Sequence, residues 1–223
     1  MQKRTIAIAD IHGCSKAFLS LLSKFGLNRS DTLFLLGDYL DRGPDPKGVI
    51  ETVLQLSRDG YDIRPLRGNH EQMFLDALVW EDRSLWLSNG GIATLLSYGV
   101  TDPGQIPEEH LGFIESLPLF AMTSTHVFVH AGLDLTLDDP FGAEGTEAML
   151  WARETFGSLT KLGGRTLVTG HTPMDLERIR SSLGTWHIEL DNGCVFNGGN
   201  VRRGRLVAAV LETGQLFLQK CPG

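Results

Sequence analysis

Cysteine is scarce in this sequence of 223 residues, which contains only Cys14, Cys194 and Cys221. The number is odd, and no two of the cysteines have a paired spacing. The sequence therefore predicts neither a disulfide framework nor a zinc ribbon. Because disulfides are rare in reducing compartments, their expected absence favours such a compartment for this protein.

Long apolar runs are also lacking, and no stretch is long and apolar enough to cross a bilayer. The apolar residues that follow Lys3 and Arg4 end at Asp10, which makes the run too short for the hydrophobic part of a signal peptide. These residues are better interpreted as a first strand. We therefore expect a cytoplasmic protein without a membrane partner.

Positive charge is in deficit, with 20 Lys and Arg against 27 Asp and Glu, a net charge of −7 and a pI near 5.5. This balance argues against a nucleic-acid partner and against a nuclease, because binding a phosphate backbone needs a basic footprint. A local basic pocket remains compatible with this negative net charge. Hydrophobic residues make up 42% of the chain and charged residues 21%, which is typical of a globular protein with a substantial core.

Strand-like and helix-like segments alternate through the first 80 residues. Near-continuous apolar runs such as "TLFLL" are typical of buried strands, and apolar residues at helical spacing, as in "AFLSLLSKF", predict helices. The order is strand 4–10, helix 15–26, strand 32–38, helix 46–60, strand 61–69 and helix 70–80. It predicts a parallel sheet with right-handed crossovers.

The rest of the chain changes character twice. Residues 81–125 combine short helical patterns with Gly/Pro loops, and we interpret Trp80 and Trp86 at their start as packing residues. Strands then return, and we expect the remainder to be all β: strands over 125–132, 165–172 and 186–193 and a hairpin over 205–220. A two-sheet core with helices outside accommodates this order better than one open sheet.

Five of the predicted strands end in polar motifs, namely "ADIHG", "GDYLDRG", "RGNHE", "HAG" and "GHT". The carboxyl ends of parallel strands share one edge of a sheet, so these motifs should lie together. Their side chains offer carboxylate, imidazole and amide ligands: Asp10, His12, Asp38, Asn69, His130 and His171. Such ligands suit Mn, Fe, Zn or Ni. Six are too many for one tetrahedral zinc but suitable for two ions.

Each of these residues has a simpler interpretation when it is taken alone. His12 could be a solvated turn residue, Asn69 a turn residue, and His130 a hydrogen-bonded core histidine. A purely structural role for all six together is disfavoured, because charged groups rarely end buried strands without a partner.

The five motifs, in this order, resemble those of the PPP family of phosphoprotein phosphatases, and most closely its short bacterial serine/threonine phosphatases. They run from residue 10 to residue 172, and "ELDNGCVFNGG" resembles the closing strands of that group. Ala9 stands where the family usually has glycine, which is the smallest possible change. The resemblance implies an α/β calcineurin-like metallophosphoesterase fold, a two-sheet β-sandwich flanked by helices. A single domain would cover residues 1–223, with a helical rim insert at about 80–120.

The resemblance also implies a ligand set for two divalent ions, with Mn expected and Fe, Zn or Ni as alternatives. By the matching positions, one ion would be held by Asp10, His12 and Asp38, and the other by Asp38, Asn69, His130 and His171. Asp38 would bridge them. The two ions would activate a hydroxide that attacks the phosphate.

The general acid implied by the resemblance is His70, with Asp41 orienting it and favouring its protonated form. The structural alternative is that His70 and Glu71 are only a helix N-terminal pair, since Glu in a first turn complements the helix dipole. Because Asp41 has no other evident partner, the acid role is favoured.

Three arginines are candidates for binding the substrate phosphate, since guanidinium groups form bidentate hydrogen bonds with phosphate oxygens. Arg42 and Arg67 flank the polar motifs, and Arg153 in "LWARE" resembles the phosphate-contacting arginine of the bacterial enzymes. The alternative to a phosphate-binding role for Arg153 is that it forms a surface pair with Glu154 on a helix.

These observations predict a phosphomonoesterase that acts on phosphoserine and phosphothreonine proteins, with phosphotyrosine as a further option. A hydrolase of symmetrical dinucleoside tetraphosphates is the alternative enzyme. That subgroup typically lacks the complete "DRG" and has "GNHD" where this chain has "RGNHE", so Asp41, Arg42 and Glu71 favour the phosphatase. A non-enzymatic phosphate-binding module is the third reading, which a missing ligand or acid would indicate, and none is missing.

Overall fold

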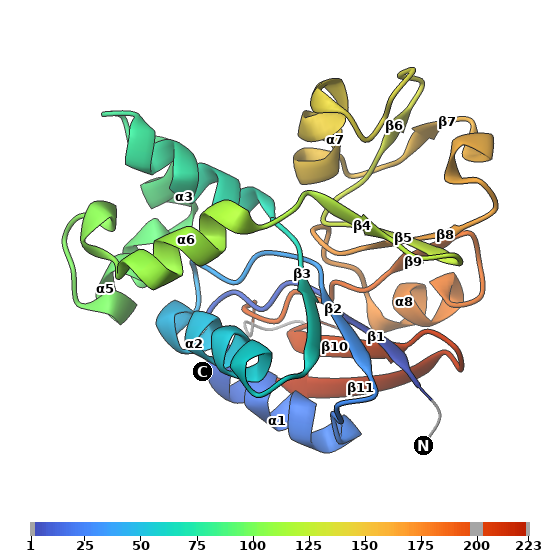
Figure 1. Cartoon of the computed structure of the whole chain (residues 1–223), viewed down its shortest axis with the longest axis horizontal. Coiled ribbons are helices and arrows are strands. Elements are labelled where there is room, and N and C mark those ends of the chain that lie inside the picture. The colour runs from blue at the N-terminus through green and yellow to red at the C-terminus, as the bar shows by residue number, and fades with distance from the viewer. Residues whose placement is uncertain (1–2, 197–202, 222–223) are drawn as a thin grey trace.

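A computed structural model describes residues 3–196 and 203–221, and its strands form two main sheets (Figure 1). The first sheet has the order β11-β10-β1-β2-β3, formed by Gln215–Lys220, Arg205–Val210, Thr5–Ile8, Thr32–Leu35 and Asp62–Pro65. The second has the order β4-β5-β8-β9, formed by Phe120–Met122, His126–Val129, Thr166–Thr169 and His187–Glu189. The strands β1, β2 and β3 are parallel to one another, and β10 and β11 form the C-terminal hairpin. The predicted parallel order and the two-sheet core are thereby confirmed.

Alternate residues of the central strands face two different cores. Ile6 and Ile8 of β1 pack with the helices, whereas Ala7 lies in the cluster between the two sheets. In β2, Leu35 likewise faces the helices and Phe34 faces the second sheet. Both faces are covered, which explains why Leu33, Phe34 and Leu35 of β2 are all apolar.

The helices α1 (Ser15–Phe25) and α2 (Pro46–Arg58) cover the outer face of the first sheet (Figure 1). α1 ends at Gly26, whose φ of 62° suits glycine because it has no Cβ. α2 begins after Asp45, whose side chain accepts a hydrogen bond from the N–H of Gly48. α3 (Asn69–Val79) follows β3 and starts within the polar motif of that strand.

Short helices occupy the middle of the chain, as predicted. They are α4 (Ser84–Trp86), the π-helical turn η1 (Leu87–Gly91), α5 (Ile92–Tyr98), η2 (Pro103–Gln105) and α6 (Glu108–Ser116). Trp86 is buried, but Trp80 is 66% exposed, so the interpretation of Trp80 as a packing residue is wrong. Among the described residues, no helix is long and apolar enough to span a bilayer.

The second half of the chain is not all β, which corrects the prediction. It contains α7 (Thr146–Trp151) and α8 (Leu176–Ser182), a small sheet of β6 (Asp134–Leu135) and β7 (Phe156–Gly157), and the 3₁₀ turns η3 (Ala143–Gly145) and η4 (Leu159–Leu162). The physical reason is topological. β5 pairs in parallel with β8, and β8 with β9, so each connection must cross from one end of the sheet to the other. α8 lies within the second of these crossovers.

The cysteines also differ from the prediction. Cys14, at the start of α1, forms a disulfide with Cys221, which follows β11, across a separation of 207 residues. Cys194 is a buried free thiol close to both of them. Sequence spacing could not reveal this pair, because the packing of α1 against β11 brings the two ends together. The disulfide removes the cysteine argument for a reducing compartment.

The two sheets meet at a stacked aromatic pair. The rings of Phe34 on β2 and Phe128 on β5 are parallel within 4°, with centroids 3.7 Å apart, and both side chains are buried. Much of the surrounding inter-sheet cluster consists of smaller residues such as Ala7 and Ala209. This pair therefore connects the strand that carries Asp38 with the strand that carries His130.

We expect Phe34→Ala to lower the free energy of unfolding by about 3–5 kcal/mol, because it leaves a cavity between the sheets. Combined with Phe128→Ala, it should show a coupling of about 0.5–1.5 kcal/mol from the lost ring contact. Denaturant unfolding of the single and double variants measures both quantities. Leu96→Ala, at an exposed position, is the control and should change stability by less than about 0.5 kcal/mol. Strict additivity of the two Phe substitutions would contradict the proposed link.

Candidate metal and phosphate site

Polar side chains from both sheets meet where the strands end. The six predicted metal ligands follow β1, β2, β5 and β8 or begin α3: Asp10, His12, Asp38, His130, His171 and Asn69. The Nε2 atom of His130 lies 2.9 Å from Oδ1 of Asn69 and 3.1 Å from Nδ1 of His171. The Nε2 atom of His12 lies 3.3 Å from Oδ2 of Asp38. The structure thus brings together residues that are up to 161 positions apart.

Asp38 lies at the centre of this cluster. Among the described residues, two groups at this site have candidate ligand atoms within 4.8 Å of one another: His12, Asp38 and His70, and Asp38, His130 and His171. Asp38 belongs to both groups, which supports its place between two ions. Asp10 belongs to neither group, and its Oδ1 accepts the backbone N–H of His171 at 2.9 Å. The role of Asp10 as a ligand stays a prediction.

Backbone carbonyl groups orient two of the imidazole rings. The Nδ1 atom of His12 lies 2.9 Å from the carbonyl oxygen of Leu40, and the Nδ1 atom of His130 lies 2.8 Å from that of Leu36. A carbonyl oxygen can only accept, so each ring carries its proton on Nδ1. The lone pair of each Nε2 consequently faces the cluster, which is the arrangement that metal-binding histidines use.

Burial controls the ionisation of the cluster. It raises the pKa of Asp38 well above its usual value, and the neighbouring charge of Asp10 raises it further. Burial also lowers the pKa of His12 and of His130 well below 6.5. Neutral imidazoles keep their lone pairs for a cation, and a cation would relieve the repulsion between the carboxylates. This donor set therefore fits divalent metal ions.

The backbone of the site is strained. Among the described residues other than glycine, a positive φ occurs only at site positions: His12 (43°), Asp38 (54°), Asp41 (66°), Arg42 (65°) and His171 (65°). Such a conformation costs about 1–3 kcal/mol per residue and persists only where surrounding contacts impose it. The observed position of the Asp38 side chain requires glycine at residue 68, because a Cβ there would lie 2.2 Å from Oδ1 of Asp38.

Glu71 supplies many of the contacts that impose this geometry. Its buried carboxylate accepts hydrogen bonds from the backbone N–H groups of Asp38 (2.8 Å), Tyr39 (2.8 Å), Leu40 (3.2 Å) and Gly68 (2.9 Å). The sequence suggested only a charge that complements the helix dipole. In the fold, Glu71 instead anchors the loop that presents Asp38 to the cluster.

His70 and Asp41 form a buried pair beside the cluster. The Nδ1 atom of His70 lies 2.7 Å from Oδ2 of Asp41. The other ring nitrogen, Nε2, is buried without a hydrogen-bond partner among the described residues and lies 4.0 Å from Oδ2 of Asp38. A buried polar atom without a partner is costly unless a ligand supplies one. Nε2 is therefore placed to serve a group that enters the site.

Burial separates the pKa values of this pair. It lowers the pKa of His70 to about 2, with Arg42 and His171 adding to the effect, and raises the pKa of Asp41 to about 7. A protonated Asp41 donates its hydrogen bond to Nδ1, which leaves the proton of the neutral ring on Nε2. When Asp41 is ionised, the ring proton moves to Nδ1. A proton is consequently available on Nε2 at pH values below about 7. Burial works against the protonated form of His70 that the sequence predicted, and that form stays a prediction.

Two of the three predicted arginines line a cavity of about 180 Å³ at the cluster. Arg42 donates from Nη1 to Nε2 of His12 at 2.8 Å, and its guanidinium also lies 5.6 Å from the ring centroid of Phe196. Arg153 follows α7 in a bend, so it does not form the surface helix pair considered as the alternative. Its charge contributes to lowering the pKa of His171 to about 4, after the larger effect of burial.

Arg67 points elsewhere and is not among the residues that line this cavity. It donates to the side chain of Gln72 at 3.0 Å and to the carbonyl oxygen of Glu115 at 2.8 Å, which ties α3 to the end of α6. We therefore leave Arg67 out of the phosphate-binding set that the sequence suggested.

Asp191 lines the same cavity and was missed as a site residue. It is buried, and this burial raises its pKa to about 6. Its Oδ1 accepts the N–H of Gly193 at 2.6 Å. The signal was present in "IELDNG", where an apolar strand ends in a charged residue as the other site strands do. The last three residues of the motif "ELDNGCVFNGG" lie outside the described residues.

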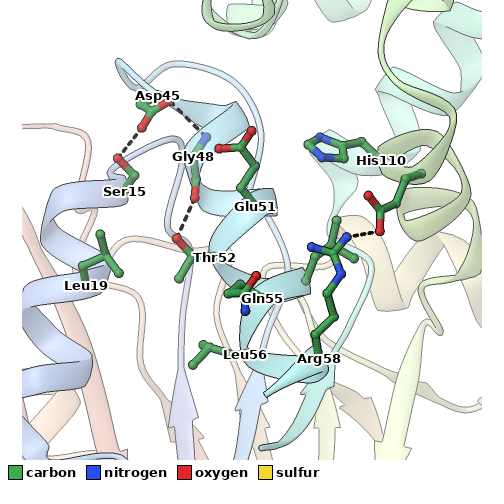
Figure 2. Close-up of a pocket in the computed structure, with 12 residues that line it drawn as sticks. Ser15, Leu19, Asp45, Gly48, Glu51, Thr52, Gln55, Leu56, Arg58 and His110 are labelled. Carbon is green, nitrogen blue, oxygen red and sulfur yellow. Dashed lines mark hydrogen bonds and ion pairs between the residues drawn. The ribbon is translucent and has the colours of Figure 1, made fainter. Parts of the chain in front are cut away.

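A larger cavity, of about 680 Å³, lies beside α1 and α2 and is lined by none of the predicted site residues (Figure 2). Several of its polar groups already bond to one another. Asp45 accepts from Ser15 at 2.6 Å and from the N–H of Gly48 at 3.0 Å, and Arg58 pairs with Glu109 (Figure 2). Among the described residues that line it, no group of His, Cys, Asp and Glu side chains comparable to that around Asp38 occurs, so the smaller cavity is the candidate site.

Comparisons with known proteins agree with this geometry. The family described as calcineurin-like phosphoesterase matches residues 3–204. Serine/threonine-protein phosphatase 1 of Salmonella typhimurium strain LT2 is 31% identical over 207 residues, covering 86% of this chain and 87% of that protein. A symmetrical bis(5'-nucleosyl)-tetraphosphatase of Acidovorax sp. strain JS42 is 42% identical over 71 residues, which are 31% of this chain and 24% of that protein. A crystal structure provisionally named a diadenosine tetraphosphatase has a TM-score of 0.66 and 27% identity, covering 99% of this chain and 95% of that one.

Asp38→Asn should reduce the binding of both metal ions rather than one, because Asp38 is the residue shared by the two ligand groups. Elemental analysis after equilibration with Mn²⁺ measures the stoichiometry, with His171→Asn as the matched single-group control. Full retention of one ion by Asp38→Asn would place the bridge at another residue.

Proposed function

Because this chain belongs to the calcineurin-like phosphoesterase family, we propose that it is a phosphatase that removes phosphate from phosphoserine and phosphothreonine in proteins. The observation that carries the proposal is Nε2 of His70, which is buried at the edge of the cluster and has no hydrogen-bond partner within the described part of the chain. A phosphate monoester of serine leaves as a basic alkoxide, which needs a proton donor at that place.

The proposed ligands, all present, are Asp10, His12, Asp38, Asn69, His130 and His171. Divalent cations held by them would lower the pKa of water and offset the negative charge of the phosphate. Mn²⁺ is the proposed metal, because the oxygen and nitrogen ligands include no thiolate.

Each of the remaining residues has one task. Arg42 and Arg153 bind the phosphate oxygens from the wall of the cavity. Water attacks phosphorus opposite the ester oxygen and releases a proton to the solvent, and the bond between phosphorus and that oxygen breaks. Nε2 of His70 gives its proton to the departing alkoxide while Nδ1 takes a proton from Asp41. Asp41 orients the ring through the hydrogen bond to Nδ1.

The size and charge of the cavity favour a phosphate monoester. Its volume is about 180 Å³, and among the described residues that line it only Arg42 and Arg153 are arginine or lysine. A tetraphosphate chain carries about four negative charges and would require a longer basic groove.

Hydrolysis of symmetrical dinucleoside tetraphosphates is the second candidate function. The structure provisionally named a diadenosine tetraphosphatase supports it, because that chain is covered almost entirely. Phe196, which is half exposed at the cavity, offers a ring on which a base could stack. A cytoplasmic location is compatible with either substrate and belongs to the proposal.

A rate comparison on one preparation tests the proposal. After chelation and resupply with Mn²⁺, we expect kcat/KM for a phosphoserine peptide to exceed that for diadenosine tetraphosphate by at least about tenfold, which corresponds to about 1.4 kcal/mol of transition-state stabilisation. The chelated protein is the control and should be inactive on both. A preference for the tetraphosphate would establish the second candidate function, and absence of turnover on every phosphoester would establish a binding module.

His70→Asn should lower kcat on a phosphoserine peptide by about 10²–10⁴-fold, the usual range for a general acid. The loss on p-nitrophenyl phosphate should be much smaller, because p-nitrophenolate leaves without a proton. Metal content, measured in parallel, should stay unchanged. Equal losses on the two substrates, or loss of metal, would mean that His70 is structural.

A further inference from the structure

Two side chains from the short helices hold the carboxylate of Asp41. The hydroxyl of Thr94, on α5, donates to Oδ1 at 2.6 Å. The indole N–H of Trp86, at the end of α4, lies 3.0 Å from Oδ1 and 3.1 Å from Oδ2. Relative exposure is 0% for Asp41 and Thr94 and 1% for Trp86, so these bonds are shielded from water.

Thr94 makes a second contact with the same residue. Its Oγ1 accepts the backbone N–H of Asp41 at 3.0 Å, while its own hydrogen goes to the carboxylate. One hydroxyl therefore constrains both the left-handed backbone of Asp41, with φ of 66°, and the rotation of its side chain. Thr94 binds Oδ1 and the indole N–H of Trp86 is shared between Oδ1 and Oδ2, which holds Oδ2 at 2.7 Å from Nδ1 of His70.

Two glycines allow these contacts to form. A Cβ on Gly91 would lie 2.5 Å from the ring of Trp86, so only glycine leaves room for the indole. Gly90, with φ of 109°, accepts the N–H of Arg42 at 3.2 Å through its carbonyl oxygen, and a Cβ there would lie 2.8 Å from Arg42. The segment "NGG" thus docks the helical insert onto the turn that carries Asp41 and Arg42.

We propose that Thr94 and Trp86 are positioning residues for proton donation: they fix the carboxylate of Asp41 so that His70 directs Nε2 into the cavity. The inference rests on the proposed function and deepens it. The helical insert would then help to position the general acid, in addition to forming a rim. Neither residue is among those that line the cavity. Both act through the hydrogen bond between Asp41 and His70.

Thr94→Val and Thr94→Ser form the matched pair that tests this role. Valine has nearly the same shape but no hydroxyl, whereas serine keeps the hydroxyl. We expect Thr94→Val to lower kcat on a phosphoserine peptide by about 10–100-fold, with KM and metal content unchanged, since misplacing an acid by a fraction of an ångström removes much of its effect. On p-nitrophenyl phosphate the loss should stay below about threefold, and Thr94→Ser should stay within about threefold of the unmodified protein on both substrates.

A double-variant cycle separates positioning from general destabilisation. If Thr94 acts through His70, Thr94→Val should cause no further loss of kcat in the His70→Asn background. The proposal would be overturned if the loss of kcat in the double variant equalled the product of the two single losses. Equal losses of Thr94→Val on the two substrates would also overturn it. Where Thr94→Val does not fold, Trp86→Phe takes its place, because it removes only the N–H donor from the buried ring.

A spectroscopic readout keeps this test independent of the proposed function. In protein loaded with diamagnetic Zn²⁺, the proton shared by Nδ1 of His70 and Asp41 should give a downfield NMR signal, assigned by its absence in His70→Asn. We expect Thr94→Val to shift or broaden this signal and Thr94→Ser to preserve it. An unchanged signal in Thr94→Val would overturn the inference, whereas failure of the proposed function would appear as an inactive unmodified protein.

Discussion

The burial of several carboxylates in one place is the constraint on which the rest of this structure depends. Asp10, Asp38 and Asp191 lie within the same buried region, and burial raises the pKa of each of them. Such a cluster is unfavourable without cations, and its loops adopt left-handed conformations that isolated residues avoid. The fold supplies the compensation through the apolar strands behind the site and through the four backbone hydrogen bonds that Glu71 accepts.

The packing of the two sheets sets the distances within the cluster. Asp38 comes from the first sheet, and His130 and His171 come from the second. The stacked rings of Phe34 and Phe128 lie a few residues behind these groups and hold the sheets together. A close-packed hydrophobic interface therefore brings the predicted ligands from the two sheets close together, because such cores deform little.

The helical insert completes the site from the outside. Trp86 and Thr94 reach Asp41 across 45 and 53 residues of sequence, and Gly90 contacts Arg42 in the same turn. Both the proposed proton donor and one of the proposed phosphate-binding arginines thus depend on a segment that contributes no predicted metal ligand. An element that looks peripheral in the sequence is connected to the chemistry by hydrogen bonds shielded from water, where each bond is stronger than at the surface.

The sequence by itself determined the first three strands, the helices between them, the family resemblance and the six polar residues of the cluster. Those signals are local: apolar periodicity within a segment, and a charged motif directly after it. Only the tertiary structure decided that Thr94 and Trp86 bind Asp41, and that Arg67 turns towards α6. It also decided that α7 and α8 lie in the connections between strands of the second sheet, and that Cys14 pairs with Cys221. The physical reason is that each of these features depends on which distant segments pack together, and neither periodicity nor spacing along the chain encodes those contacts.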